Sequence, residues 1–472
     1  MENRVMNNCL FKKADRTKHF TVVLLWALLS PLLSCEDFVE VDPPVNQLSG
    51  EVVFSDPATV EATLIDIYTQ LRDNVLTVGN SSGLGFLLGI YGDELIYYGN
   101  TASDLQQFHT NSLISTNGTV TSFWRGCYNL IYAANSIIEG LESTPISDMD
   151  RDRYLGEAHF LRAFIHFYLV NIFGDVPYVD STDFLENREI ARLEEAQVYE
   201  KIIGDLRLAK SLLPIEYAGA GRARPNKWVA TAMLSRTYLY MGQWQQALEE
   251  ATEVVAQGGY VMNADTGGVF LKSSAETLWQ LDTGTEGLNT LDAQLYVLTS
   301  GPPPLVSLSD TLVNSFEAGD ARFTDWVGLV TDGSDTWYFP FKYRANTLTS
   351  TTQECSIMVR LAEMHLIMAE AHTRLGNLEG ARAQLDIIRE RAALPSIGAV
   401  GEAELLDAIA HERRVELFTE LGHRFLDLKR TGTANTELSG TKPNWGDTDL
   451  RWPIPESELV LNPNLKPKND GY

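Results

Sequence analysis

The stretch YLGEAHFLRAFIHFYLVNIFGDVP, residues 154–177, decides the fold class of this chain. From residue 154 to residue 173 the apolar side chains lie on most faces of a helix rather than on one stripe. Such a pattern indicates a helix that is buried in the middle of a larger helical body. Gly174 ends this helix, and the turn at residues 175–177 follows it. The neighbouring segments should therefore supply the helices that cover it.

Other segments have the spacing that such covering helices require. Residues 57–73 and 122–142 carry apolar side chains at helical intervals. Residues 198–213 form another amphipathic pattern, which ends at Pro214. The sequence thus predicts a mainly α fold.

Two later stretches look like one helical hairpin written twice. Aligned on their glycines, the matching positions are Leu234, Tyr238, Gly242, Trp244 and Ala247 in the first copy and Met368, His372, Gly376, Leu378 and Ala381 in the second. Glycine permits a tight turn between the helices, and alanine lets them approach closely. The spacing resembles the tetratricopeptide repeat. A weaker copy surrounds Gly174.

Two regions differ from the helical segments in composition. Residues 74–121 and 258–352 are rich in Gly, Ser, Thr and Asn. Long irregular segments inside a compact domain usually carry function, so the binding surface is expected there. The predicted organisation is one domain over residues 35–472, with a helical scaffold at about residues 57–73, 122–257 and 355–430.

The first 34 residues have the features of an export signal. Four basic residues at positions 12–18 precede an apolar run at residues 20–29. The run is too short to span a bilayer, which takes about 20 residues. Leu32, Ser34 and Cys35 resemble a bacterial lipobox, which predicts a lipoprotein signal peptide at 1–34 and a lipidated Cys35 that anchors the chain to a membrane. An ordinary cut near Ser34, with an incidental cysteine, is the alternative.

Charge and motif content narrow the classes of function. The net charge of −26 disfavours nucleic acid and anionic lipid as partners, because both are bound through Lys and Arg. Cys127 and Cys355 have the environment of buried thiols, with a disulfide between them as the alternative. The segment at residues 411–415 lacks the second histidine of a zinc-protease helix, and no nucleophile elbow or phosphate-binding loop occurs. The sequence predicts no enzyme, no metal and no cofactor.

Specific segments along the whole mature chain resemble one known family. They lie at residues 35–44, 156–168, 173–177, 360–371, 412–430, 452–459, 462–465 and 471–472. Together they are similar to the SusD/RagB family of outer-membrane nutrient-binding lipoproteins. The resemblance implies tetratricopeptide-like hairpins as a scaffold and a loop-rich half that carries the ligand site.

The resemblance also implies a function and a partner. Members of this family sit on a SusC-like TonB-dependent transporter, capture a glycan at the cell surface and deliver it to the barrel. In some members the ligand is a peptide, and a tetratricopeptide-type protein-interaction scaffold without glycan binding is a further alternative. Glu36 and Asp37, directly after the cysteine, look like the surface-export signal of such lipoproteins.

The first candidate binding residues lie in the loop at residues 91–100. A sugar is recognised by flat aromatic faces together with amides and hydroxyls. Tyr98 and Asn100 supply both kinds of group, and the matching segment of the family contributes to its glycan platform. Tyr97 and Tyr98 are expected to point in opposite directions, so that only one of them is available.

A second cluster of candidates lies in the other irregular region. Trp337 follows the turn signal at residues 332–335, which places it where it could stack on a ligand. Tyr338 and Trp326 are further ligand-binding candidates, with core packing as the competing interpretation for Tyr338. The acidic composition favours a neutral glycan, unless a basic patch around Arg344 offsets the field.

A dense run of charged residues near the C-terminus suggests catalysis at first sight. It consists of Glu416, Glu420, Arg424, Asp427 and Arg430. Their spacing of three or four residues is typical of ion pairs on adjacent faces of a helix. Structural pairing is therefore the preferred interpretation.

Overall fold

The computed structural model describes residues 56–141 and 146–472. The described residues belong to one compact unit, Val53–Tyr472. The predicted signal peptide, Cys35, Glu36 and Asp37 lie outside the described residues. None of the helices in the described ranges is long and apolar enough to cross a membrane.

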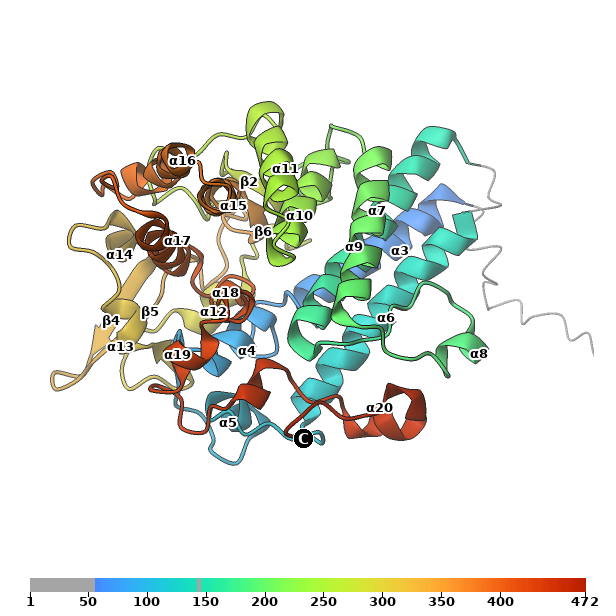
Figure 1. Ribbon diagram of the computed structural model, residues 1–472, viewed down its shortest axis with the longest axis horizontal. Helices are drawn as coiled ribbons and strands as arrows, with labels where there is room; N and C mark the ends of the chain where they lie inside the picture. Colours follow the sequence, from blue (N-terminus) through green and yellow to red (C-terminus); the bar gives the residue numbers. More distant parts are fainter. Residues whose placement is uncertain (1–55, 142–145) are drawn as a thin grey trace, which may run out of the picture. The chain divides into compact units, whose positions relative to one another are not determined.

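A continuous row of packed helices forms most of this unit. Its members are α3 (Pro57–Asp73), α6 (Gly118–Leu141), α7 (Asp148–Phe173), α9 (Glu195–Leu212), α10 (Lys227–Tyr240), α11 (Trp244–Gln257), α15 (Leu361–Arg374), α16 (Leu378–Arg391) and α17 (Glu402–Leu417). Helix α7 packs against α6 and α9, α11 packs against α10 and α15, and α15 packs against α16 (Figure 1). The predicted mainly α fold with tetratricopeptide-like hairpins is confirmed.

Helix α7 lies inside this row, as its apolar pattern predicts. Almost every residue from Tyr154 to Phe173 is buried. Gly174 ends the helix with a φ of 78°, a value that residues with a Cβ rarely adopt.

The two hairpins that the sequence repeats have the same turn. Gly242 and Gly376 have φ values of 66° and 80°. In the first turn the Gln243 amide donates to the Tyr238 carbonyl at 2.9 Å, and in the second Asn377 donates to His372 at the same distance. Both are Schellman turns, which close the C-terminus of a helix. Ala247 and Ala381 are fully buried at the contact between the helices, as predicted.

This turn gives a simple stability prediction. Gly376→Ala should lower the free energy of unfolding by about 1 to 2 kcal/mol, because only the left-handed backbone is strained. No atom lies within 4 Å of a Cβ added there, so a steric clash does not contribute. Gly204→Ala, in the regular part of α9 and equally free of neighbours, is the matched control and should stabilise the protein. Urea unfolding of both variants checks the difference in sign.

The regions at residues 74–121 and 258–352 contain more regular structure than their composition predicts. The short helices are α4 (Leu84–Tyr91), α5 (Asp104–His109), α12 (Leu291–Tyr296), α13 (Asp310–Val313) and α14 (Ala321–Trp326). The strands are β1 (Leu95–Tyr97), β2 (Thr277–Leu281), β3 (Val306–Leu308), β4 (Val327–Thr331), β5 (Thr336–Pro340) and β6 (Ser356–Arg360). They form three two-stranded antiparallel sheets, β1–β3, β2–β6 and β4–β5. Two of the sheets pair segments far apart in sequence, which local patterns cannot show.

Besides two 3₁₀ helices, η2 (Asp447–Leu450) and η3 (Pro463–Leu465), four further α-helices complete the described elements. They are α8 (Phe184–Asn187), α18 (His423–Thr431), α19 (Ala434–Leu438) and α20 (Glu456–Leu461). Cys127 and Cys355 are both buried and free, which confirms the prediction of buried thiols.

A buried ion network joins the irregular half to the scaffold. Glu416 on α17 is fully buried and accepts hydrogen bonds from Arg322 of α14 at 3.0 Å and Arg360 of β6 at 2.5 Å. Arg391, at the end of α16, also donates to it. Burial alone would raise the pKa of Glu416, but Arg391, Arg360 and Arg322 outweigh burial and hold this pKa well below its usual range.

The charged residues at 416–430 form ion pairs, as the preferred interpretation predicts. Most of these pairs, however, join the run to residues outside it, and not to neighbours on the same helix. Only Asp427 and Arg430 pair within one helix, at 2.7 Å. Arg424 pairs instead with Asp93, at 2.8 Å. The reason is that α17 ends at Leu417 and α18 begins at His423, so the run does not form one helix.

Candidate functional site

Tyr98 extends the pairing of β1 with β3 by one residue. Its amide donates to the Leu305 carbonyl at 2.7 Å, and its hydroxyl lies 3.2 Å from the Ser307 hydroxyl. The ring is 40% exposed, whereas the ring of Tyr97 is buried. This confirms that the two tyrosines point in opposite directions and that Tyr98 is the available one.

Asn100 follows on the exposed side of the same loop. Its Oδ1 accepts from the Ala102 amide at 2.9 Å, which fixes the side chain. Its carbonyl accepts from the Ser103 hydroxyl at 2.6 Å. The Nδ2 group has no hydrogen-bond partner among the described residues, so it is left as a donor for a ligand.

Trp337 contacts the beginning of the segment at residues 301–307, and Tyr98 contacts its end. It is half-buried on β5, opposite Val330 of β4. A Cβ added at Gly301 would overlap with Cζ3 and Cε3 of the indole, so the ring lies directly against the Gly301 backbone. Because β3 contacts β5, Tyr98 and Trp337 both lie against one segment, residues 301–307.

Two of the predicted site residues need correction. Trp326 is 1% exposed, its Nε1 donates to the Thr266 carbonyl at 2.8 Å, and Lys342 lies over its ring at 5.1 Å. It is therefore a core residue with no face for a ligand. Tyr338 follows Trp337 on the strand and points to the opposite side, where its ring lies 6.0 Å from that of Phe323. Core packing explains its position.

Sequence reasoning missed the segment at residues 299–304, which adjoins the residues that contact Trp337 and Tyr98. Thr299, Ser300, Pro302 and Pro304 are exposed. The hydroxyl groups add hydrogen-bonding capacity, and the prolines restrict the backbone. The run of three prolines at residues 302–304 was a visible signal of a fixed loop, but only the tertiary contacts bring this part of the chain against Tyr98 and Trp337.

The electrostatics of this surface disfavour anions. The turn before Trp337 carries Asp332, whose carboxylate accepts from the amides of Asp335 and Ser334, and these bonds hold its pKa below the usual range. Arg344 donates to the Asp325 carbonyl at 2.6 Å and lies 3.8 Å from its carboxylate, so its charge is offset locally. Beneath the Tyr98 loop, burial and Asp93 raise the pKa of Glu94 to about 7.

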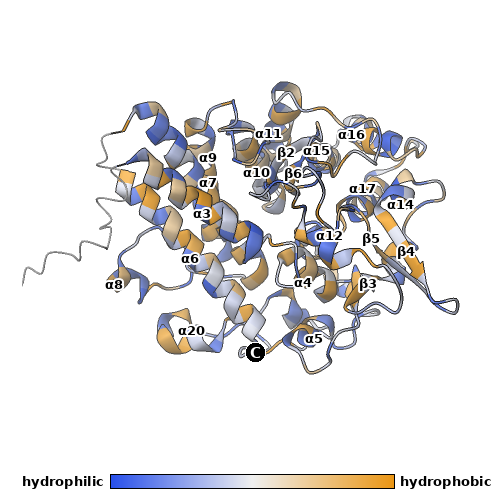
Figure 2. Ribbon diagram, turned by 180° about the vertical axis from the view of Figure 1, so that it is seen from behind, coloured by the Kyte–Doolittle hydropathy of each residue, from blue (hydrophilic) through white to orange (hydrophobic). Residues whose placement is uncertain are grey.

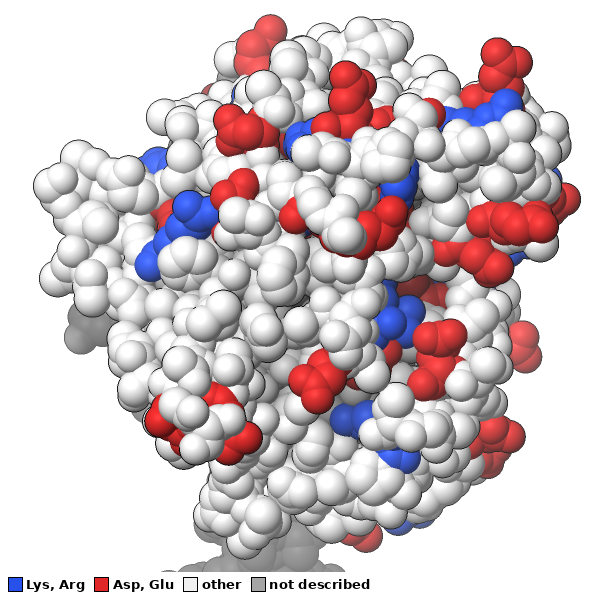
Figure 3. All heavy atoms as spheres, turned by 90° about the vertical axis from the view of Figure 1, so that its left-hand side faces the viewer, with Lys and Arg blue, Asp and Glu red and all other residues white. Residues whose placement is uncertain are grey.

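The side of the molecule that carries β4 and β5 has a mostly uncharged surface. Figure 3 shows the side of β4, β5, α13 and α14, where charged side chains stand in small separate groups among wider uncharged areas. Strand β4 has the orange of hydrophobic residues in Figure 2. This side therefore offers a ligand mostly uncharged side chains.

The contact of Trp337 with Gly301 makes this glycine a positioning residue. Gly301→Ala should displace the indole and weaken ligand binding roughly tenfold, which corresponds to about 1.4 kcal/mol. Gly398→Ala is the matched control, because its Cβ would meet no atom within 4 Å. Affinity measured with one polysaccharide for both variants checks this expectation, and equal affinities would contradict it.

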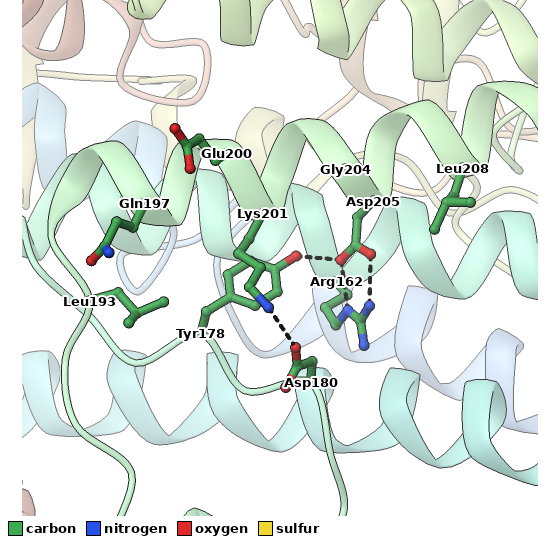
Figure 4. A pocket seen from close by; sticks show the side chains of 10 residues that line it. All are labelled: Arg162, Tyr178, Asp180, Leu193, Gln197, Glu200, Lys201, Gly204, Asp205 and Leu208. Atoms are coloured by element: carbon green, nitrogen blue, oxygen red, sulfur yellow. Dashed lines mark hydrogen bonds and ion pairs between the residues drawn. The ribbon is translucent and has the colours of Figure 1, made fainter.

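A hollow of about 670 Å³ lies elsewhere, over α7 and α9 (Figure 4). At its floor Asp205 accepts two hydrogen bonds from Arg162, at 2.7 Å each, and one from Tyr178. Lys201 pairs with Asp180 at the rim, at 3.2 Å. Because these charged groups already have partners, this hollow offers less to a ligand than the Tyr98 and Trp337 surface.

Two family models match different parts of the chain. One, described as starch-binding and associating with the outer membrane, matches residues 89–239. The other, described as the SusD family, matches residues 327–472. The first range includes Tyr98 and α7, and the second includes Trp337 and α15.

Curated relatives match along nearly the full chain. SusD-like protein P2 of Formosa agariphila is 29% identical over 515 aligned positions, covering 94% of this chain and 98% of the relative. SusD-like protein P25 of the same organism is 24% identical, covering 96% and 99%.

Solved structures share the fold. A laminarin binding SusD-like protein has a TM-score of 0.76 and 26% identity, with 88% of this chain and 99% of that chain covered. A SusD superfamily protein from Bacteroides vulgatus has a TM-score of 0.77 and 22% identity, with 89% and 100% covered.

Proposed function

Because this chain belongs to the SusD/RagB family, we propose that it captures a glycan at the cell surface and delivers it to a SusC-like TonB-dependent transporter. The family model over residues 89–239 describes starch binding in association with the outer membrane. A structural neighbour with 26% identity is described as laminarin binding. Both support oligosaccharide or polysaccharide as the ligand class and binding without catalysis as the role.

The observation that carries the proposal is that Tyr98 and Trp337 both contact the segment at residues 301–307. Tyr98 presents a ring that is 40% exposed, and the Trp337 ring is fixed against Gly301. Thr299 and Ser300, just before Gly301, have exposed hydroxyl groups, and the Nδ2 of Asn100 has no hydrogen-bond partner among the described residues. Aromatic faces beside a few fixed polar groups are what an uncharged sugar requires.

The local charges support a neutral glycan as the ligand. The Asp332 turn is negative, and the charge of Arg344 is offset by Asp325. A uronic or sulfated sugar would thus meet repulsion at this surface. The proposed anchor is the lipid on Cys35, which would hold the protein at the outer membrane, facing outward.

Affinity electrophoresis of residues 36–472 tests the proposal. The gels should contain laminarin, starch, other neutral polysaccharides and, for comparison, an acidic polysaccharide. Retardation by at least one neutral polymer, and not by the acidic one, is the expected result. If no glycan retards the protein, the glycan proposal fails and the peptide alternative becomes the better one.

A further inference from the structure

The hydrogen bonds at the two ends of the β4–β5 pair show which backbone groups of β4 face β5. At one end the Phe341 amide donates to the Trp326 carbonyl at 2.8 Å. At the turn end the Asp332 amide donates to the Asp335 carbonyl at 3.3 Å. Both bonds continue the register of the pair. Hydrogen-bonded and non-bonded pairs alternate along an antiparallel ladder, so the bonded positions within β4 are 328 and 330.

Every second residue of β4 therefore directs its backbone away from β5. Gly328 and Val330 face β5, whereas the N–H and C=O groups of Leu329 and Thr331 point outward. No other described residue forms a hydrogen bond with these outward groups. Leu329 is 58% exposed, and Thr331 is exposed as well. Pro340 of β5 also falls at a non-bonded position, where its missing N–H leaves no gap in the ladder.

Other strands lack such an open edge. Strands β2 and β3 are buried along their full length. On β2 the Gln280 amide donates to the Arg222 carbonyl at 3.2 Å, so that edge has a partner within the protein. Strand β4 lies at the margin of the molecule in both ribbon views (Figures 1 and 2). Residues 327–331 contain no charge, proline or bulge, the usual features that keep an edge strand from pairing.

The turn that follows β4 is acidic. Asp332 and Asp335 are both exposed, and neither forms a salt bridge with a described residue. Residues 324–341 contain no Lys or Arg. The same stretch of a second copy would bring further carboxylates to this turn and no cation, so self-pairing of β4 is disfavoured. A strand that carries a basic residue at this end fits better.

We propose that the outer edge of β4 binds an extended segment of another polypeptide, which adds to the β4–β5 sheet as a further strand. Leu329 and Thr331 would each exchange N–H···O=C bonds with it. Antiparallel addition is the more stable arrangement, and it places the N-terminal residue of the segment beside the Asp332 turn. A basic residue there completes the match. The Leu329 side chain lies on the opposite face of the sheet from Trp337, so this surface differs from the proposed glycan surface.

Fluorescence anisotropy of a labelled, end-blocked peptide, Lys-Val-Thr-Val-Thr-Val, added to the full chain tests the proposal. Saturable binding is the expected result, and a peptide with Glu in place of Lys should bind more weakly. The same peptide with methyl groups on all of its amide nitrogens cannot donate to β4 and should not bind. No saturable binding of the first peptide, or equal binding of the methylated one, overturns the proposal. The assay contains no glycan, so its result does not depend on the proposed glycan function.

Two variants of one residue locate the binding edge. Leu329→Pro removes an outward N–H but none that bonds to β5, and should weaken peptide binding at least about tenfold. Leu329→Thr keeps the N–H and the preference for a strand, and should bind within about threefold of the wild type. Thermal unfolding checks that both variants are folded, and the methylated peptide makes the same test on the unchanged protein. Equal affinities of the two variants overturn the proposal.

Sedimentation equilibrium of the full chain tests the other occupant of this edge. We expect a monomer over the concentration range of the peptide assay. Dimerisation that Leu329→Pro abolishes would assign the edge to a second copy of the chain, and would overturn the proposal of a different polypeptide.

Discussion

Glu416→Gln should lower the free energy of unfolding by about 3 to 5 kcal/mol, the range found when one partner of a buried ion pair is removed. Glu416 is fully buried and accepts hydrogen bonds from Arg322, Arg360 and Arg391. The amide keeps the size of the side chain but leaves three buried guanidinium groups without this negative charge. Chemical unfolding at neutral pH, followed by circular dichroism, measures the loss.

The effect should also depend on pH in a defined direction. Because the folded-state pKa of Glu416 is lowered, its contribution is fully present above its unfolded-state pKa of about 4.5 and declines as the pH falls below that value. The difference between the wild type and Glu416→Gln should therefore narrow in acid. Glu390→Gln, at an exposed position of α16, is the control and should change stability by less than about 0.5 kcal/mol. A similar loss in both variants would contradict the proposed network.

Trp337→Ala should weaken glycan binding by about 2 kcal/mol, or roughly 30-fold, as expected for a central aromatic contact. The indole lies against Gly301, in the segment that also contacts Tyr98. Truncation removes this stacking surface. Affinity electrophoresis or calorimetry with a polysaccharide that binds the wild type measures the loss.

A control variant at another exposed aromatic residue separates the loss of a binding contact from a general effect of removing an aromatic side chain. Tyr132 on α6 is 53% exposed and lies outside the proposed site. Tyr132→Ala should leave glycan affinity unchanged, whereas Trp337→Phe should recover part of what Trp337→Ala loses. If Trp337→Ala binds like the wild type while the fold is retained, the proposed surface is wrong.

The sequence was sufficient for the helical scaffold because the signals there are local. Apolar residues on most faces of residues 154–173 predict a buried helix, and α7 is one. The repeated glycine and alanine spacing predicts two hairpins, and Gly242 and Gly376 form the same turn. Helix periodicity and a left-handed glycine depend on residues within a few positions of each other, so a single sequence displays them.

The candidate site was predicted only in part. The exposure of Tyr98 follows from strand alternation with Tyr97, which the sequence displays. The prediction that Trp326 binds the ligand was wrong, because the local sequence around an aromatic residue does not show whether its ring is buried or exposed. The contact of Trp337 with Gly301 joins two segments that no local pattern connects.

By itself, the sequence determined the class of this protein: a helical-repeat scaffold with an irregular half, an acidic surface that disfavours polyanions, and a family resemblance along the mature chain. Tertiary structure alone decided which side chains meet. It paired β1 with β3, and it brought both Tyr98 and Trp337 against residues 301–307. The physical reason is that packing and buried ion pairs join residues hundreds of positions apart, whereas helices and turns form between neighbours.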